Sequence, residues 1–208
     1  MLLVLKLGGA YTPFPLYFHE LSSKNPELLY EDDKVLVRTI PLQHRVYTNG
    51  FLFQEKEGER RLNMDAIAQY PEIEVCDYQN IKNGKDITLE NGKTIANTEL
   101  TFEPHRPQSY AYCSDTVYLE DLATEIQGTR VIYHESTFLK INEELAAKTM
   151  HATAYQAGIV AKNAQAEALI LGHYSSRYPD VNMFKQEAQE VFKNVLLAED
   201  GKKFVFEN

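Results

Sequence analysis

The sequence is short of several residue types, and each shortage excludes a class of protein. Its two cysteines, Cys76 and Cys113, are too few and too unpatterned for a disulfide framework or a thiolate zinc site. A reducing cytoplasm is therefore the expected compartment. No run of residues stays apolar over the about 20 positions that a membrane span needs. The leucine-rich opening, residues 1–7, is too short for a signal peptide. We expect no membrane association.

Positive charge is also scarce. The chain has 21 lysine and arginine residues against 30 aspartate and glutamate residues, a net charge of −9. Nucleic-acid-binding domains usually carry a basic surface, so this balance argues against a nucleic-acid partner unless a local basic cluster or metal ions replace the missing charge. A length of 208 residues, 44% of them hydrophobic, suits a single globular domain over residues 1–208.

The amino-terminal half predicts two strands, residues 35–40 and 50–54, because both runs are rich in β-branched and aromatic residues. Residues 55–85 are polar and poorly periodic, and they form either an excursion from the core or a plain surface loop. After them, Asn91-Gly92 between residues 86–90 and 93–96 is a strong signal for a tight hairpin.

The carboxy-terminal half alternates strand and helix, which indicates an α/β sheet covered by helices. Thr153 and Gln156 form a capping box at the start of a helix. The expected strands are residues 109–113, 131–133, 168–171 and 204–206, and the expected helices are residues 117–126, a helix from residue 154, and residues 184–195.

Potential metal ligands follow the strands at the points where they end. His44 follows the first strand, Asp115 follows residues 109–113, His134-Glu135 follows residues 131–133, and His173 follows residues 168–171. If these strands are parallel neighbours, their ends meet at one edge of the sheet, where α/β proteins bind ligands. Imidazole and carboxylate groups bind zinc and other first-row metals. Each residue alone could equally be a surface residue, and Asp115 could cap a helix.

Two further groups suit phosphodiester chemistry. His151 lies two residues before the Thr153 cap, where it could exchange a proton near neutral pH or simply sit in an exposed loop. Ser175, Ser176 and Arg177 follow His173 closely, and a guanidinium with two hydroxyls can hold a phosphate. The alternative is an ordinary polar loop.

Segments in a fixed order carry a resemblance to a known family. They are residues 41–44 (PLQH), 78–84 (YQNIKNG) with 88–92 (TLENG), 114–116 (SDT), 134–138 (HESTF), 151–157 (HATAYQA) and 169–178 (LILGHYSSRY). Together they resemble ribonuclease Z, a tRNA 3′-end endonuclease of the metallo-β-lactamase superfamily, over essentially the whole chain. The resemblance implies an α/β fold, the αββα sandwich of that superfamily, here lacking its amino-terminal portion.

The resemblance also implies roles for individual residues. His44 would bind one zinc ion, His173 a second, and Asp115 would bridge both. His151, supported by Glu135, would assist proton transfer. Ser175, Ser176 and Arg177 would hold the phosphate. The substrate would be precursor tRNA, cut by two-metal hydrolysis to leave a 3′-hydroxyl.

Ser114 stands where many members of the family have Gly and Ala152 where they usually have Ser, and two departures from the family pattern are larger. Residues 55–85 would correspond to the tRNA-binding arm, but residues 70–75 are acidic and lack the family's usual Gly-Pro pair. The family's His-x-His-x-Asp-His motif, which supplies most of the metal ligands, does not occur in the chain. We therefore expect weak zinc binding and no nuclease activity from this chain alone.

Two other readings remain open. One is a non-catalytic binding or assembly subunit derived from the family, and the other is a metallo-β-lactamase-type phosphodiesterase acting on small molecules. A sandwich without part of its sheets would expose strand edges and apolar surface, so we also expect a homodimer with residues 1–7 near the contact.

Overall fold

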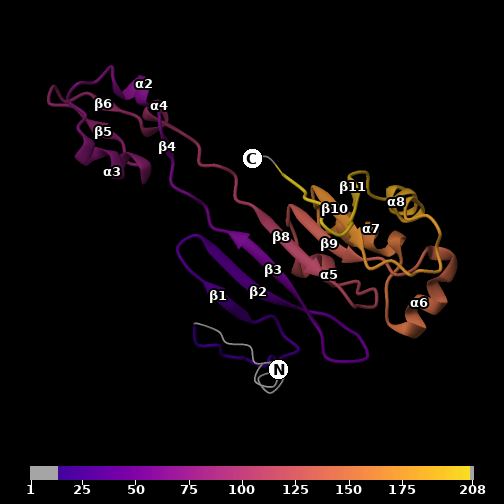
Figure 1. Ribbon diagram of the computed structural model, residues 1–208. Helices are drawn as coiled ribbons and strands as arrows, with labels where there is room; N and C mark the ends of the chain where they lie inside the picture. Colours follow the sequence, from indigo (N-terminus) through magenta and orange to yellow (C-terminus); the bar gives the residue numbers. More distant parts are fainter. Residues whose placement is uncertain (1–13, 207–208) are drawn as a thin grey trace.

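A computed structural model describes residues 14–206 and is built around one mixed sheet (Figure 1). The residues 1–7 expected near a dimer contact lie outside the described part. In the described part, the sheet has the strand order β1 (Leu28–Glu31), β2 (Val35–Pro41), β3 (Asn49–Glu55), β8 (Ser109–Cys113), β9 (Val131–Glu135), β10 (Ala168–Gly172) and β11 (Val195–Leu197).

The strand directions bring distant parts of the chain to one edge. Strands β8, β9, β10 and β11 are parallel neighbours. Strand β3 is antiparallel to both β2 and β8, so β2 runs in the same direction as β8. The carboxyl ends of β2, β8, β9 and β10 therefore meet along a single edge, which is called the rim below.

Helices cover one face of the sheet. They are α5 (Leu122–Glu125), α7 (Ala154–Asn163) and α8 (Asn182–Gln189), with η2 (Lys140–Asn142) and α6 (Glu143–Thr149) beside the rim. Alternate strand residues such as Ile132, Leu169 and Leu171 pack against Val160 and Phe184 in the main core. Among the described residues, no helix is long and apolar enough to cross a membrane.

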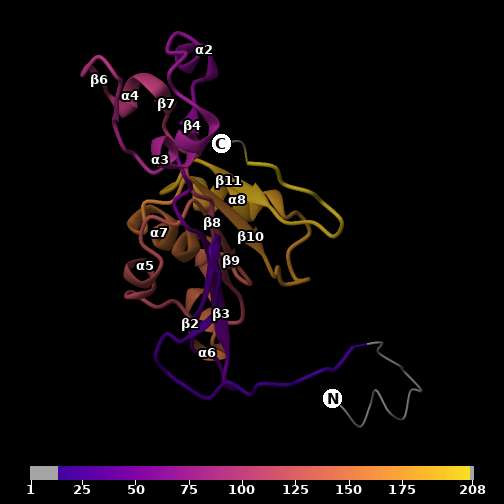
Figure 2. The same ribbon diagram turned by 90° about the vertical axis from the view of Figure 1, so that its left-hand side faces the viewer.

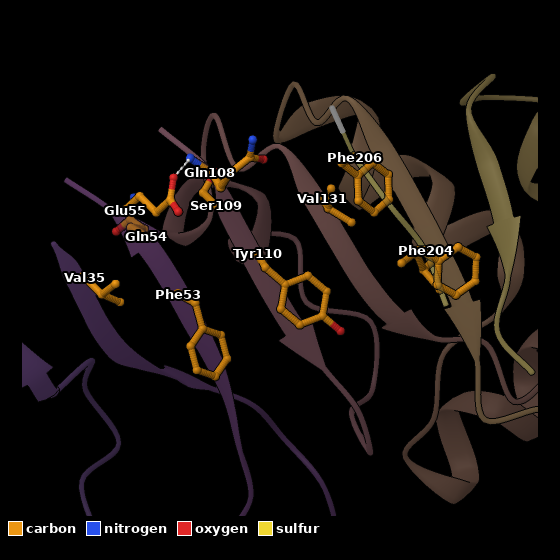
Figure 3. Close-up of a pocket in the computed structure, with 11 residues that line it drawn as sticks. Val35, Phe53, Gln54, Glu55, Gln108, Ser109, Tyr110, Val131, Phe204 and Phe206 are labelled. Carbon is orange, nitrogen blue, oxygen red and sulfur yellow. Dashed lines mark hydrogen bonds between the residues drawn. The ribbon is translucent and has the colours of Figure 1, made fainter. Parts of the chain in front are cut away.

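The opposite face of the sheet carries fewer covering elements. Val131, Ala168 and Ile170 form a small buried cluster there, flanked by Tyr110, Tyr133 and the carboxy-terminal Phe204 and Phe206. A groove on this face is lined by side chains from β2, β3, β8, β9 and β10 and by the two phenylalanines (Figure 3). Its volume is about 560 Å³. Phe53 remains 40% exposed and Tyr112 38% exposed. This surface is called the open face.

Residues 56–108, between β3 and β8, form a small body that projects from the sheet in both views (Figures 1 and 2). It is called the arm. Its elements are β4 (Arg61–Leu62), α2 (Met64–Ile67), η1 (Val75–Asp77), α3 (Tyr78–Lys82), β5 (Ile87–Thr88), β6 (Thr94–Ile95), α4 (Asn97–Leu100) and β7 (Thr101–Phe102).

The arm has a core of its own, centred on Ile81, Ile95 and Leu100. The expected Asn91-Gly92 hairpin is present as β5–β6, with Gly92 at φ +81°. Because this hairpin and α4 pack into the same cluster, the body extends beyond the residues 55–85 that the sequence marked out. The arm leaves from the end of β3 and returns at the start of β8, so it stands at the edge of the sheet opposite the rim.

An ion-pair network ties the carboxyl end of the arm to the sheet, and Lys56 at its start pairs with Glu31 of β1. Arg106, at the carboxyl end of the arm, pairs with Glu167 in the turn before β10. Glu167 also accepts a 2.9 Å hydrogen bond from Nε of Arg130 at the start of β9. The Arg130 guanidinium holds the pKa of the Glu167 carboxyl below its ordinary value.

The helix expected over residues 117–126 is shorter than predicted. The backbone N–H of Val117 donates to the carbonyl of Gln43, which ties this residue to the loop after β2 and delays the helix until Leu122. Two other predictions for this half of the chain are confirmed. Strand β8 covers residues 109–113, and helix α7 begins with the Thr153–Gln156 capping box.

The carboxy-terminal end also differs from the prediction. The helix expected over residues 184–195 ends as α8 at Gln189, and Val195 instead pairs with Leu169 in the sheet. Residues 204–206, expected as a strand, are irregular and lie over the open face. In both cases the apolar residues pack as expected, but tertiary contacts choose a different backbone conformation.

Candidate metal centre

The rim gathers the polar residues that the sequence singled out. His44 lies three residues after β2, Asp115 two residues after β8, and His173 directly after β10. Glu135 is the last residue of β9, and His151 comes from the loop between α6 and α7. Parallel strands explain this convergence, since their carboxyl ends share one edge.

Glu135 is the buried centre of the rim, with 0% of its surface exposed. Its carboxylate accepts hydrogen bonds from the backbone N–H groups of Thr116 (2.9 Å), Thr137 (3.2 Å) and Ala152 (3.1 Å). The hydroxyl of Thr137 donates a further bond of 2.7 Å. A buried carboxylate needs such partners, and here they connect three separate loops.

The histidines of the rim all use Nδ1 to bind the protein. His151 Nδ1 lies 2.7 Å from Oε1 of Glu135. His173 Nδ1 lies 2.8 Å from Oγ1 of Thr137, which must accept because its hydroxyl proton goes to Glu135. His44 Nδ1 donates to the carbonyl of Met150 at 2.9 Å. Because each Nδ1–H is occupied, the Nε2 atom of each neutral ring carries the lone pair, and Nε2 of His173 faces the Asp115 carboxylate.

The free groups lie close to one another. The ring centroids of His44 and His151 are 4.9 Å apart, and those of His151 and His173 are 5.3 Å apart. Ligand atoms of His44, Asp115 and His151 all lie within 4.8 Å of one another. His173 Nε2 is 3.2 Å from Oδ1 of Asp115, and both side chains are accessible, at 41% and 49% exposure.

This donor set suits a first-row metal ion. Imidazole nitrogen and carboxylate oxygen are zinc ligands, and in such sites the second ring nitrogen of the histidine typically donates to a carboxylate or carbonyl. The rim has that outer arrangement at His44, through Met150, and at His173, through Thr137. His151, which the sequence marked for proton transfer, is also within ligand distance of the others.

The backbone at the rim is strained. Asp115 (φ 54°), Met150 (φ 62°) and His173 (φ 59°) are in the left-handed region, which costs a non-glycine residue about 1–2 kcal/mol. Gly172 is required beside His173, because a Cβ atom there would overlap the Tyr133 hydroxyl. Strained residues gather at functional sites when surrounding contacts hold them in place.

Arg177 is held beside this centre. Its Nε donates to Oγ of Ser175 at 3.2 Å, and its guanidinium stacks on the Phe138 ring, 4.9 Å from the centroid. The Phe138 ring is also 6.2 Å from that of His151. Arg177 and Ser176 are exposed, and Ser175 is half-buried. An exposed guanidinium next to a metal centre can bind an anionic group.

The sequence suggested that His134 follows the end of its strand, but the structure places it within the strand. Strand β9 continues through His134, which is fully buried in the helix-covered layer between Cys113 and Leu171. Its Nδ1 donates to the carbonyl of Glu135 at 2.7 Å, and Nε2 has no hydrogen-bond partner among the described residues. Burial lowers the pKa of His134 below its ordinary value.

Sequence reasoning overlooked three residues of the centre. Thr137 and Phe138 lie within residues 134–138, but no role was predicted for them or for Met150. The left-handed conformation of a methionine has no sequence signal, and the contacts of Thr137 and Phe138 depend on chain segments that meet only in the fold.

The sequence was compared with those of known proteins. No family model matches the sequence. A ribonuclease Z of Phocaeicola vulgatus is 40% identical over 195 residues, which cover 94% of this chain and 63% of the relative. A ribonuclease Z of Cytophaga hutchinsonii is 40% identical over 201 residues, which cover 96% of this chain and 64% of the relative. The chain thus spans about three fifths of the length of the curated relatives it matches.

Solved structures support the fold. A metallo-β-lactamase fold protein of Bacillus subtilis superposes with a TM-score of 0.55 at 15% identity, covering 87% of this chain and 52% of that chain. The short form of human tRNase Z gives a TM-score of 0.50 at 20% identity, covering 85% and 45%. The expected metallo-β-lactamase fold is confirmed.

Proposed function

This chain is a homologue of the ribonuclease Z proteins, and from that premise we propose that it is the metal-binding unit of a zinc-dependent endoribonuclease that removes the 3′ trailer from precursor tRNA. The observation that carries the proposal is the common orientation of the rim histidines. His44, His151 and His173 each bind the protein through Nδ1, which leaves Nε2 available next to Asp115.

Zinc ions would be held by the groups that have free donor atoms. His44 would bind one ion, His173 a second, and Asp115 would bridge them. Bound zinc would supply Lewis-acid chemistry on the phosphodiester. Two ions need more than these three ligands, because even one catalytic zinc commonly takes three protein ligands plus water. This chain alone therefore binds zinc weakly and is inactive as a nuclease.

The residues of the chain would handle the proton and the phosphate. Glu135 fixes His151 in the tautomer whose Nε2 faces the centre, so a protonated His151 can give its Nε2 proton to the departing 3′-oxygen of the tRNA. Arg177, held by Ser175 and Phe138, would bind the phosphate, and Ser176 would contact it from the same loop.

The arm would contact the tRNA away from the cleaved bond. Residues 56–108 contain ten acidic and seven basic residues, so no overall attraction to RNA arises there. Local contacts from basic residues such as Arg61, Lys82 and Lys85 would have to provide it. The non-catalytic alternative has less support, since a binding subunit has no chemical need for the Nδ1 contacts of the rim histidines.

The open face supports a homodimer. Its groove of about 560 Å³ and the exposed rings of Phe53 and Tyr112 form an apolar surface of the kind that associating proteins bury. Light scattering on the purified chain tests this, and a monodisperse monomer would contradict it.

The free state of Cys76 and Cys113 agrees with a reducing, cytoplasmic compartment.

The main experiment compares the purified chain with the same chain joined to the His-x-His-x-Asp-His segment of a relative. We expect cleavage of precursor tRNA only from the joined protein, and its loss in His151→Ala of that protein. Cleavage by the chain alone at the rate of a full-length relative contradicts the proposed inactivity. A joined protein that cleaves a small phosphodiester but not precursor tRNA supports the phosphodiesterase reading instead.

A further inference from the structure

Helices α6 and α7 end in the same backbone motif, but only one of these ends is at the rim. After α6, the N–H of Met150 donates to Ala147 and that of His151 to Ala146. After α7, the N–H of Gln165 donates to Lys162 and that of Ala166 to Ala161. This pair of bonds requires a left-handed residue just beyond the helix, a position that glycine usually fills.

Both helices have a non-glycine residue at that position. Met150 has φ 62° and Gln165 has φ 56°. The side chain of each residue makes its left-handed conformation unfavourable, so neither is the residue type that best ends a helix. Gln165 lies just beyond the far end of α7, about 18 Å from the Thr153 cap at the helical rise per residue.

At the end of α6, the carbonyl of the left-handed residue contacts a rim histidine. The carbonyl of Met150 lies 2.9 Å from Nδ1 of His44, a residue 106 positions away in the sequence. A carbonyl can only accept, so His44 must carry its proton on Nδ1. His151 is the next residue in the chain, and the His44 and His151 rings are 4.9 Å apart.

We propose that Met150 is a positioning residue whose left-handed backbone aims its carbonyl at Nδ1 of His44 and so keeps Nε2 of His44 free for a metal ion. The proposal rests on the proposed function, in which His44 is a ligand. Outer partners of this kind set the tautomer and orientation of ligand histidines, and their loss typically weakens metal binding about 10- to 100-fold.

Two groups of substitutions test the backbone rather than the side chain. Met150→Gly and Met150→Asn keep a residue that adopts the left-handed conformation, whereas valine, being β-branched, resists it. Gln165→Val is the matched control, because it puts the same residue into the same motif at the end of α7 away from the histidines.

The first readout is the imidazole ¹⁵N spectrum of the full chain without metal, which reports the proton position on His44. We expect the Nδ1–H form in the wild type, Met150→Gly, Met150→Asn and Gln165→Val, and a mixture of tautomers in Met150→Val. The second readout is zinc titration, in which we expect Met150→Val to bind about 10- to 100-fold more weakly than the wild type and Gln165→Val to bind equally.

Several results would overturn the proposal. A wild-type His44 with its proton on Nε2 does so without any variant, which covers the case in which Met150→Val fails to fold. Unchanged tautomer and zinc affinity in Met150→Val, or equal losses in Gln165→Val, also do so. A wild type that fixes the tautomer but binds no zinc contradicts the proposed function instead, while the tautomer shift in Met150→Val still supports the positioning role.

Discussion

The rim and the arm stand at opposite edges of one sheet, and each is organised around a buried polar side chain. At the rim, the Glu135 carboxylate accepts bonds from three backbone N–H groups, a hydroxyl and His151. In the arm, the Asn97 amide donates to the carbonyls of Ile81 and Lys85, and Thr101 donates to its oxygen. One centre is a carboxylate that binds backbone N–H groups, a hydroxyl and one imidazole, and the other is a neutral amide that binds backbone carbonyls.

Glu135 and Asn97 themselves make contacts of similar range, but the two regions around them differ in how far along the chain their other contacts reach. The arm contacts of Asn97 join residues 4, 12 and 16 positions apart. The rim contact between His44 and Met150 joins residues 106 positions apart, and the Thr137–His173 contact spans 36. The arm is built from one continuous segment, residues 56–108, while the rim joins segments from residue 44 to residue 173 that meet only when the sheet has assembled.

Replacing Glu135 should produce the largest effect. A glutamine would place its own NH₂ donors against the backbone N–H groups and the hydroxyl that now donate to the carboxylate. We expect Glu135→Gln to lower the free energy of unfolding by about 3–5 kcal/mol, the usual cost of breaking a buried charged network. Urea denaturation followed by circular dichroism measures it. Glu103→Gln, at a side chain that is 76% exposed, is the control and should change little. A loss below about 1 kcal/mol in Glu135→Gln would mean that Glu135 does not organise the rim.

Replacing Asn97 should affect the arm alone. Asn97→Ala removes the amide that donates to the carbonyls of Ile81 and Lys85, although the Ile81 carbonyl keeps the N–H of Gly84, and we expect a cost of about 1–3 kcal/mol. We expect faster hydrogen exchange in residues 60–103 and unchanged imidazole spectra of His151 and His173. The exposed Asn80→Ala is the control. Exchange that rises equally in the sheet would show that the two regions unfold together.

Acid should weaken the sheet before it weakens the arm, whose residues 60–103 contain no histidine. Because burial lowers the pKa of His134 in the folded chain, the unfolded chain takes up this proton first as pH falls below about 6.5. The stability that neutral His134 contributes is fully present above that pH. Below it, the free energy of unfolding should fall by up to about 1.4 kcal/mol per pH unit.

Denaturation measured at several pH values between about 7 and 5 tests this sign. His134→Leu should flatten the dependence whatever its effect on absolute stability, and the exposed His105→Leu should leave it unchanged. A dependence that survives in His134→Leu would assign it to other groups.

Much of the fold follows from local patterns. The hairpin at Asn91-Gly92 and the capping box at Thr153 have the predicted structure because their signals act over a few residues. The predictions that were wrong lie where distant contacts decide. Val117 bonds to Gln43 instead of entering a helix, and Val195 joins β10 instead of extending α8.

The sequence by itself determined which residues follow the strands, and hence that His44, Asp115, Glu135 and His173 could reach a common edge. It did not determine how their ring nitrogens are oriented. That was decided by the tertiary structure, through the carbonyl of Met150, the hydroxyl of Thr137 and the buried carboxylate of Glu135. The physical reason is that a histidine tautomer depends on the partner of its other nitrogen, and these partners come from chain segments that meet only in the folded protein.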